Sequence, residues 1–189
     1  MKNLEKDLAW LKAVLDYRLQ WAINRYSQEQ TVTLAQLPPP SIVDERDRYG
    51  QFIIKHNISI AERLLLILSI IPHAEPFYLT EALAHLKAAT NDLETKVLFV
   101  RYDTPKFLEF ALFRDPNLGY YLPTGNTFLY LLFGQDIKSR LAYSHLLKNS
   151  HPFYQQKILH KQALKGAAVF GSELLLADIS FYESLLNNK

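Results

Sequence analysis

The chain has 189 residues, 49% of them hydrophobic and 21% charged, which is typical of a globular domain and excludes a disordered or low-complexity protein. It has no cysteine, which excludes a disulfide framework, a thiolate zinc site and a cysteine nucleophile, and its net charge of +2 is too small to indicate a polyanionic partner by itself. The N-terminus alternates charges and no apolar run has the length of a membrane span, so we expect a soluble cytoplasmic protein.

The first 26 residues predict a helix, because leucines recur there at spacings of three and four. A second line of residues points about 120° around the same axis. This aromatic line either packs in the core, as aromatic stripes usually do, or contacts a partner. Its members are Trp10, Val14, Tyr17 and Trp21. Three prolines then follow in Leu37–Ser41, which predicts an extended, stiff connector.

The middle of the chain predicts further helices. Ser59 and Glu62 have the spacing of a capping box, so a helix should begin there, and the run 64–71 is apolar all round, so that helix should be buried and should end at Pro72. A second helix is expected over 77–86. The runs 97–100 and 107–110 are β-branched and aromatic, which indicates short strands or irregular chain.

The C-terminal part has the order of a winged helix. Thr124 is expected to cap an apolar helix that ends at Gly134, and Asp136 a second helix over 137–148. The runs 156–160 and 172–176 predict a hairpin, and a short helix capped by Asp178 closes the chain. The expected fold is therefore α+β, predominantly α-helical, with a winged-helix-like C-terminal half and a small β-hairpin wing. We expect one α-rich domain over 1–189, made of a helix and connector (1–37), central helices (41–118) and the winged-helix-like unit (119–189).

No catalytic constellation is evident in the sequence. The stretch Gly119–Thr127 is superficially similar to a phosphate loop, but its spacing has one residue too many and no lysine precedes the threonine. None of the six histidines forms an i, i+4 ligand pair with another histidine, and no glycine-flanked serine provides a nucleophile elbow. These observations predict a protein that is not an enzyme and has no cofactor and no metal.

Positive charge is concentrated in the basic segment, residues 137–171, which has six cations and no acidic residue, whereas the rest of the chain carries 15 basic against 19 acidic residues. Cations around a recognition helix and wing are what phosphate contacts need, so a DNA-binding transcriptional regulator is one interpretation. The helix lacks the arginine and asparagine set that reads base edges, and a solvated basic face or an acidic protein partner explains the same charges. The six cations are Lys138, Arg140, Lys148, Lys157, Lys161 and Lys165.

The segment Gly119–Thr127, with Phe128, Leu131, Leu132 and Gly134, resembles a motif of one family: the winged-helix-like N-terminal region of bacterial AAA+ ATPases, including those encoded with phage-tail-like contractile injection systems. The similarity extends over His151–Phe153, 158–159 and 174–186, and to the opening helix and 59–68. Two features depart from the family pattern: Asn126 replaces an acidic residue, and Lys106–Asp115 replaces an approach rich in tryptophan or glycine.

Members of that family carry a downstream ATPase module, and no phosphate loop occurs in these 189 residues, so the resemblance implies no ATPase activity here. It implies instead a non-catalytic adaptor that binds a protein partner, such as an AAA+ ATPase or a contractile-system component. We expect the contact to be made by the aromatic line or by the motif turn, residues 123–126. The candidate contact residues are Trp10, Val14, Tyr17, Trp21, Pro123, Thr124 and Asn126.

Overall fold

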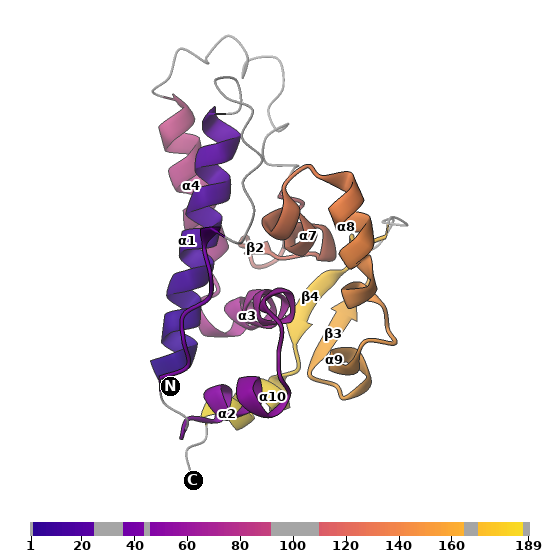
Figure 1. The fold of residues 1–189 in the computed structure, drawn as a ribbon. Coiled ribbons are helices and arrows are strands. Elements are labelled where there is room, and N and C mark those ends of the chain that lie inside the picture. The colour runs from indigo at the N-terminus through magenta and orange to yellow at the C-terminus, as the bar shows by residue number, and fades with distance from the viewer. Residues whose placement is uncertain (1, 25–35, 44–45, 92–109, 165–169, 187–189) are drawn as a thin grey trace.

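A buried central helix, α3 (Ile60–Ala74), organises the structure, a computed structural model that describes residues 2–24, 36–43, 46–91, 110–164 and 170–186 (Figure 1). Ser59 and Glu62 form the expected capping box, and the run 64–71 is fully buried. The predicted end at Pro72 is wrong, because Pro72 lies inside the last turn. A proline there removes one intrahelical hydrogen bond, and the amide of Glu75 still donates to the carbonyl of Ile71.

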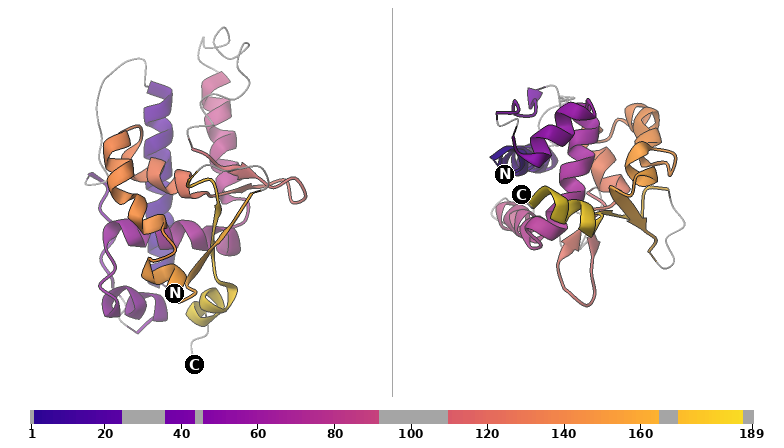
Figure 2. Two further views of the ribbon diagram at one scale, coloured as in Figure 1. Left: turned by 90° about the vertical axis from the view of Figure 1, so that its right-hand side faces the viewer. Right: turned by 90° about the horizontal axis from the view of Figure 1, so that it is seen from below.

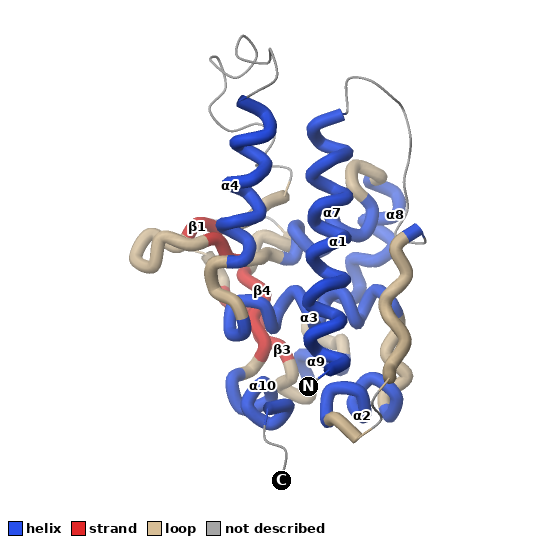
Figure 3. Tube along the Cα trace, turned by 90° about the vertical axis from the view of Figure 1, so that its left-hand side faces the viewer, coloured by secondary structure: helices blue, strands red, loops and turns tan. Residues whose placement is uncertain are grey.

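The other elements pack around α3. The long helices α1 (Lys2–Asn24) and α4 (Tyr78–Asn91) lie side by side, and α1 also contacts α3 and α7 (Gly125–Phe133) (Figures 1 and 3). On the other side, the hairpin of β3 (Leu159–Gln162) and β4 (Leu174–Ala177) places β4 against α3. One hydrophobic core cluster includes residues from Leu4 in α1 to Leu185 near the C-terminus.

Several described elements were not predicted. Helix α2 (Arg48–Lys55) begins at Asp47, whose side chain accepts a hydrogen bond from the amide of Gly50, and it packs against α1 and α10 (Ile179–Leu186). The short strands β1 (Phe113–Arg114) and β2 (Tyr121–Leu122) pair antiparallel and carry a loop that projects from the body (Figure 2). The two hairpins together with the helices make this an α+β fold that is mostly helical.

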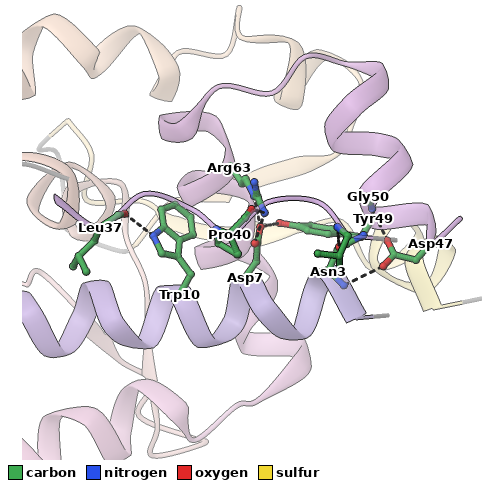
Figure 4. Close-up of polar contacts among 10 residues, drawn as sticks. Asn3, Asp7, Trp10, Leu37, Pro40, Asp47, Tyr49, Gly50 and Arg63 are labelled. Atoms are coloured by element: carbon green, nitrogen blue, oxygen red, sulfur yellow. Dashed lines mark hydrogen bonds and ion pairs between the residues drawn. The ribbon is translucent and has the colours of Figure 1, made fainter. Parts of the chain in front are cut away.

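A buried polar network ties α1, the proline connector, α2 and α3 together (Figure 4). The carboxylate of Asp7, 0% exposed, pairs with the guanidinium of Arg63 at 2.5 Å and accepts from the hydroxyl of Tyr49 at 2.5 Å. Burial, and then the neighbouring charge of Asp7, raise the pKa of Tyr49, so this hydroxyl remains a donor. Arg63 also donates to the carbonyl of Pro40 at 2.8 Å, which holds the extended connector against the helices.

Arg18 links α1 to the C-terminal end of α7. Its buried guanidinium donates through Nε to the carbonyl of Leu131 at 2.9 Å and through Nη2 to that of Leu132 at 2.7 Å. These carbonyls belong to the last turn of α7, where a cation is favoured by the helix dipole. Gly134 ends α7 with φ +56 and ψ −121, a conformation suited to glycine, and this confirms the predicted stop.

The C-terminal elements follow the predicted order with shifted bounds. Helix α8 (Ile137–Tyr143) is capped by Asp136, as expected. It ends at Tyr143 and is followed directly by a short 3-10 helix, η2 (Ser144–Leu147). The predicted single helix over 137–148 is therefore wrong. A short helix, α9 (Pro152–Gln155), precedes β3, and Asp178 caps α10 through the amides of Ser180 and Phe181. The run 97–100 and the first three residues of the run 107–110 lie outside the described residues, and Phe110 is a buried turn residue. No described helix is both long and apolar enough to cross a membrane.

Candidate functional site

The motif turn is engaged in contacts within the chain. Thr124 caps α7: its hydroxyl accepts from the amide of Thr127 at 3.2 Å and donates to the carbonyl of Ala111 at 2.7 Å. The next two amides are also bonded, that of Gly125 to the carbonyl of Glu173 at 3.2 Å and that of Asn126 to the carbonyl of Gly171 at 2.6 Å. A phosphate at a helix start would be bound by these backbone amides, and here they are already hydrogen-bonded within the chain.

A close approach of two backbones explains the glycine in this turn. A Cβ added at Gly125 would lie 3.0 Å from the Cα of Gly171 and 2.9 Å from Cδ1 of Leu147. On the other side, Pro123 is buried and its carbonyl accepts from the amide of Leu175 at 2.9 Å. The motif turn therefore joins the start of α7 to the approach to β4. Pro123 and Thr124 are not available to a partner, and the half-buried Asn126 donates to the carbonyl of Phe170 at 3.2 Å.

The described part of the aromatic line packs inside the molecule. Trp10 is 6% exposed and its indole N–H donates to the carbonyl of Leu37 at 2.8 Å (Figure 4). Val14 is 1% exposed. Both residues lie in the core, as the core interpretation predicts, and Trp10 anchors the connector, so neither side chain is exposed for a partner contact. Tyr17 is half-buried, with its hydroxyl 3.5 Å from Oε1 of Gln36. The side chain of Trp21 lies outside the described part of the chain.

Helix α8 exposes apolar side chains. None of its residues is buried, and Ile137 and Leu141 are 69% and 68% exposed. At about 100° per residue, residues four apart lie about 40° from each other around the axis, so these two side chains form one apolar ridge, the α8 ridge. Sequence reasoning missed this ridge because a helix is normally recognised by an apolar face that it buries, and α8 buries none. The signal that was present is the i, i+4 pair directly after a strong N-cap.

The α8 ridge is carried on a fixed support. Asp136 accepts from the amide of Ser139 at 3.2 Å and from its hydroxyl at 2.6 Å, and these hydrogen bonds lower the pKa of Asp136, so the capping carboxylate is ionised at neutral pH. The rings of Phe133 and Tyr143 pack with their centroids 4.7 Å apart, which joins the far end of α8 to α7. α8 also lies at the edge of the molecule in both the side view and the view from below (Figures 1 and 2).

The cations of the basic segment have different environments. Lys138, Lys148 and Lys157 are exposed, and Arg140 is half-buried. Lys161 is engaged within the chain: its ammonium donates to the carbonyl of Leu147 at 2.8 Å and lies 5.2 Å from the ring centroid of Tyr154. Lys165 lies outside the described residues.

His151 connects α9 to the start of α3. Its Nδ1 accepts from the amide of Phe153 at 3.3 Å, so its Nε2 carries the proton that is shared with the carboxylate of Glu62 at 3.2 Å. Burial lowers the pKa of His151 against the opposing charge of Glu62, and the neutral ring therefore prevails at neutral pH. Burial works against ionisation of Glu62, but hydrogen bonds from Ser59 and the nearby His151 lower the pKa of its carboxyl.

No site with metal-binding geometry is found where the chain is described: no three His, Asp or Glu side chains there lie together in an arrangement that could hold a metal ion. Comparison of the chain with protein-family models, with curated proteins and with solved structures found no match. Ile137 and Leu141 are the most exposed large apolar side chains among the described residues, and they make the α8 ridge the candidate site.

Proposed function

We propose that this chain is a non-catalytic adaptor that binds a protein partner through the α8 ridge. The observation that carries the proposal is a short capped helix with no buried residue that exposes Ile137 and Leu141 on one face. Exposure of two large aliphatic side chains to water is unfavourable, and a partner that buries them gains that free energy on binding. Apolar contacts are the usual centre of a protein interface.

The resemblance described above supports the same class of function. In the proposed setting the protein is cytoplasmic and its partner is a component of a larger machine, such as an AAA+ ATPase or a contractile-system protein. The order α7, α8, β3–β4 and α10 supports a winged-helix-like unit, in which α8 takes the position of the second helix. In this arrangement α7 packs in the core and α8 packs on α7 with its other side exposed.

Photo-cross-linking in living cells tests the proposal. A photoreactive phenylalanine at the exposed Ala142, beside the ridge, is expected to give an adduct that disappears when Leu141→Ser is added. The matched control is Ile179→Ser, which removes a comparably exposed isoleucine from α10 and should leave the adduct unchanged. The proposal is refuted if a probe at the exposed Ala13 of α1 gives the same adducts, or if Leu141→Ser has no effect.

DNA binding remains the second candidate, and the exposed Lys138, Lys148 and Lys157 are the observation that favours it. A shift assay on duplex DNA over a salt series separates the two functions. Micromolar binding with a steep salt dependence, weakened by Lys148→Gln, would support a regulator. The absence of a shift at low salt would remove this candidate.

A further inference from the structure

We infer that the partner segment is an acidic amphipathic helix, which packs its apolar residues on the α8 ridge and its carboxylates against the cations beside it. This inference rests on the proposed function and adds the chemistry of the ligand. Its first support is the distribution of charge around α8. Taking Ile137 as the origin and about 100° per residue, Leu141 lies at about +40°, Lys138 at about +100° and Arg140 at about −60°. A cation therefore borders the ridge on each side.

The second support is the lack of competing negative charge in the sequence around the ridge. No aspartate or glutamate occurs between Ile137 and Gly171. The acid that immediately precedes α8, Asp136, is already bonded to the amide and hydroxyl of Ser139. An acidic ligand thus meets cations on a stretch of chain that carries no carboxylate of its own, and such complementarity selects partners by charge.

The third support is the shape and extent of the surface. α8 continues directly into η2, where His145 is exposed, and then into the exposed Lys148. Seven α-helical and four 3-10 residues extend over roughly 18 Å, about the length of three turns of a partner helix. A ridge of residues four apart packs into the grooves of another helix, so the partner should carry apolar residues at i, i+4 and i+7.

The same features favour a peptide over nucleic acid. Ile137 and Leu141 are 69% and 68% exposed and lie between Lys138 and Arg140 around the axis of α8. A phosphate backbone would leave these aliphatic side chains in contact with water or with charge, whereas the apolar face of a helix covers them. Nucleic-acid binding through this face is therefore an outcome that would contradict the inference.

Nuclear magnetic resonance of the isotope-labelled full chain tests the inference with defined probes. Three 18-residue helical peptides have the same amphipathic pattern and differ only in the residues of the two faces. The first has leucine on the apolar face and glutamate on the polar face, the second leucine and lysine, and the third alanine and glutamate. The leucine–glutamate peptide is expected to shift the backbone amides of residues 137–148. Each of the other two should bind at least tenfold more weakly, since the lysine peptide carries the opposite charge and the alanine peptide lacks the large apolar side chains. A 20-base-pair duplex is the fourth probe.

Charge reversal provides the matched variants. Lys138→Glu with Arg140→Glu is expected to weaken binding of the leucine–glutamate peptide about tenfold or more. Lys6→Glu with Lys12→Glu makes the same change of charge at exposed positions of α1 and should leave the affinity unchanged. The inference is overturned if millimolar leucine–glutamate peptide shifts no amide of 137–148, if the lysine peptide binds equally well, or if only the duplex shifts these residues. In those cases a cross-link at position 142 that needs Leu141 would still support the proposed function, so the two failures are distinguishable.

Discussion

Replacing Asp7 by asparagine is expected to lower the free energy of unfolding by about 3–5 kcal/mol. Asp7 is fully buried and holds the guanidinium of Arg63 and the hydroxyl of Tyr49 at 2.5 Å. Asparagine preserves the volume but presents one amide donor to a site that holds donors, and it leaves the guanidinium without its counter-charge. Because small domains are stable by only about 5–15 kcal/mol, this change removes a large part of the total stability.

Urea unfolding followed by circular dichroism measures this loss. The control is Asp16→Asn, which neutralises an exposed carboxylate of the same helix and should change stability by no more than about 0.5 kcal/mol. Replacing both partners, Asp7→Leu with Arg63→Met, should be less destabilising than the sum of the two single changes, because the double variant leaves no isolated charge in the core. A loss under about 1 kcal/mol for Asp7→Asn, or additivity within about 0.5 kcal/mol, would refute the reasoning.

Three further predictions concern the end of α7, the buried His151 and the α8 ridge. Gly134→Ala is expected to destabilise the protein by about 1–3 kcal/mol, because alanine is strained at φ +56 and its Cβ would lie 3.1 Å from Nη1 of Arg18. The control is Gly119→Ala, where φ is +76 and no atom lies within 4 Å of the added Cβ. This control should lower the free energy of unfolding by less in the same urea assay. Stability should fall as the pH drops below about 6.5, because the lowered pKa of His151 lets the unfolded chain take up the proton first. In urea titrations at pH 7 and pH 5, His151→Asn should reduce this decrease, and its side-chain oxygen can replace Nδ1 as the capping acceptor. His160→Asn, on the exposed side of β3, should leave the decrease unchanged, and equal slopes for the two variants would contradict the assignment. Leu141→Ser should change the free energy of unfolding by no more than about 0.5 kcal/mol, and a loss above about 1.5 kcal/mol would show that the ridge is packed in solution.

Local signals in the sequence predicted the elements well. The caps at Ser59, Thr124 and Asp136 and the stop at Gly134 all lie where hydrogen bonds between residues three or four positions apart determine the backbone. Asp47 is a cap of the same kind, and a search for caps followed by apolar pairs would have found α2. Bounds were less predictable: the bounds of strands β3 and β4 lie one to three residues from the predicted ones, and α8 ends five residues earlier than predicted.

Contacts between distant residues were not predictable in this way. The pairing of Asp7 with Arg63 joins positions 56 residues apart, and each residue alone resembles an ordinary solvated charge on a helix. For the candidate site the difficulty is different. A sequence shows which side chains are apolar, but whether they are covered depends on the neighbours that the fold supplies, and so Trp10 is buried while Ile137 is exposed.

The motif turn and the α8 ridge are connected through α7. The start of α7 is bonded to the approach to β4 through Gly125 and Asn126, and its end is bonded to α1 through Arg18. A helix fixed at both ends gives the chain that leaves at Gly134 a defined direction, and the cap at Asp136 and the ring of Tyr143 then set the orientation of α8. A surface held in this way loses little conformational entropy on binding, which favours affinity. In the proposed adaptor, the residues of the motif turn act on recognition through the helix that they orient, without contacting the partner themselves.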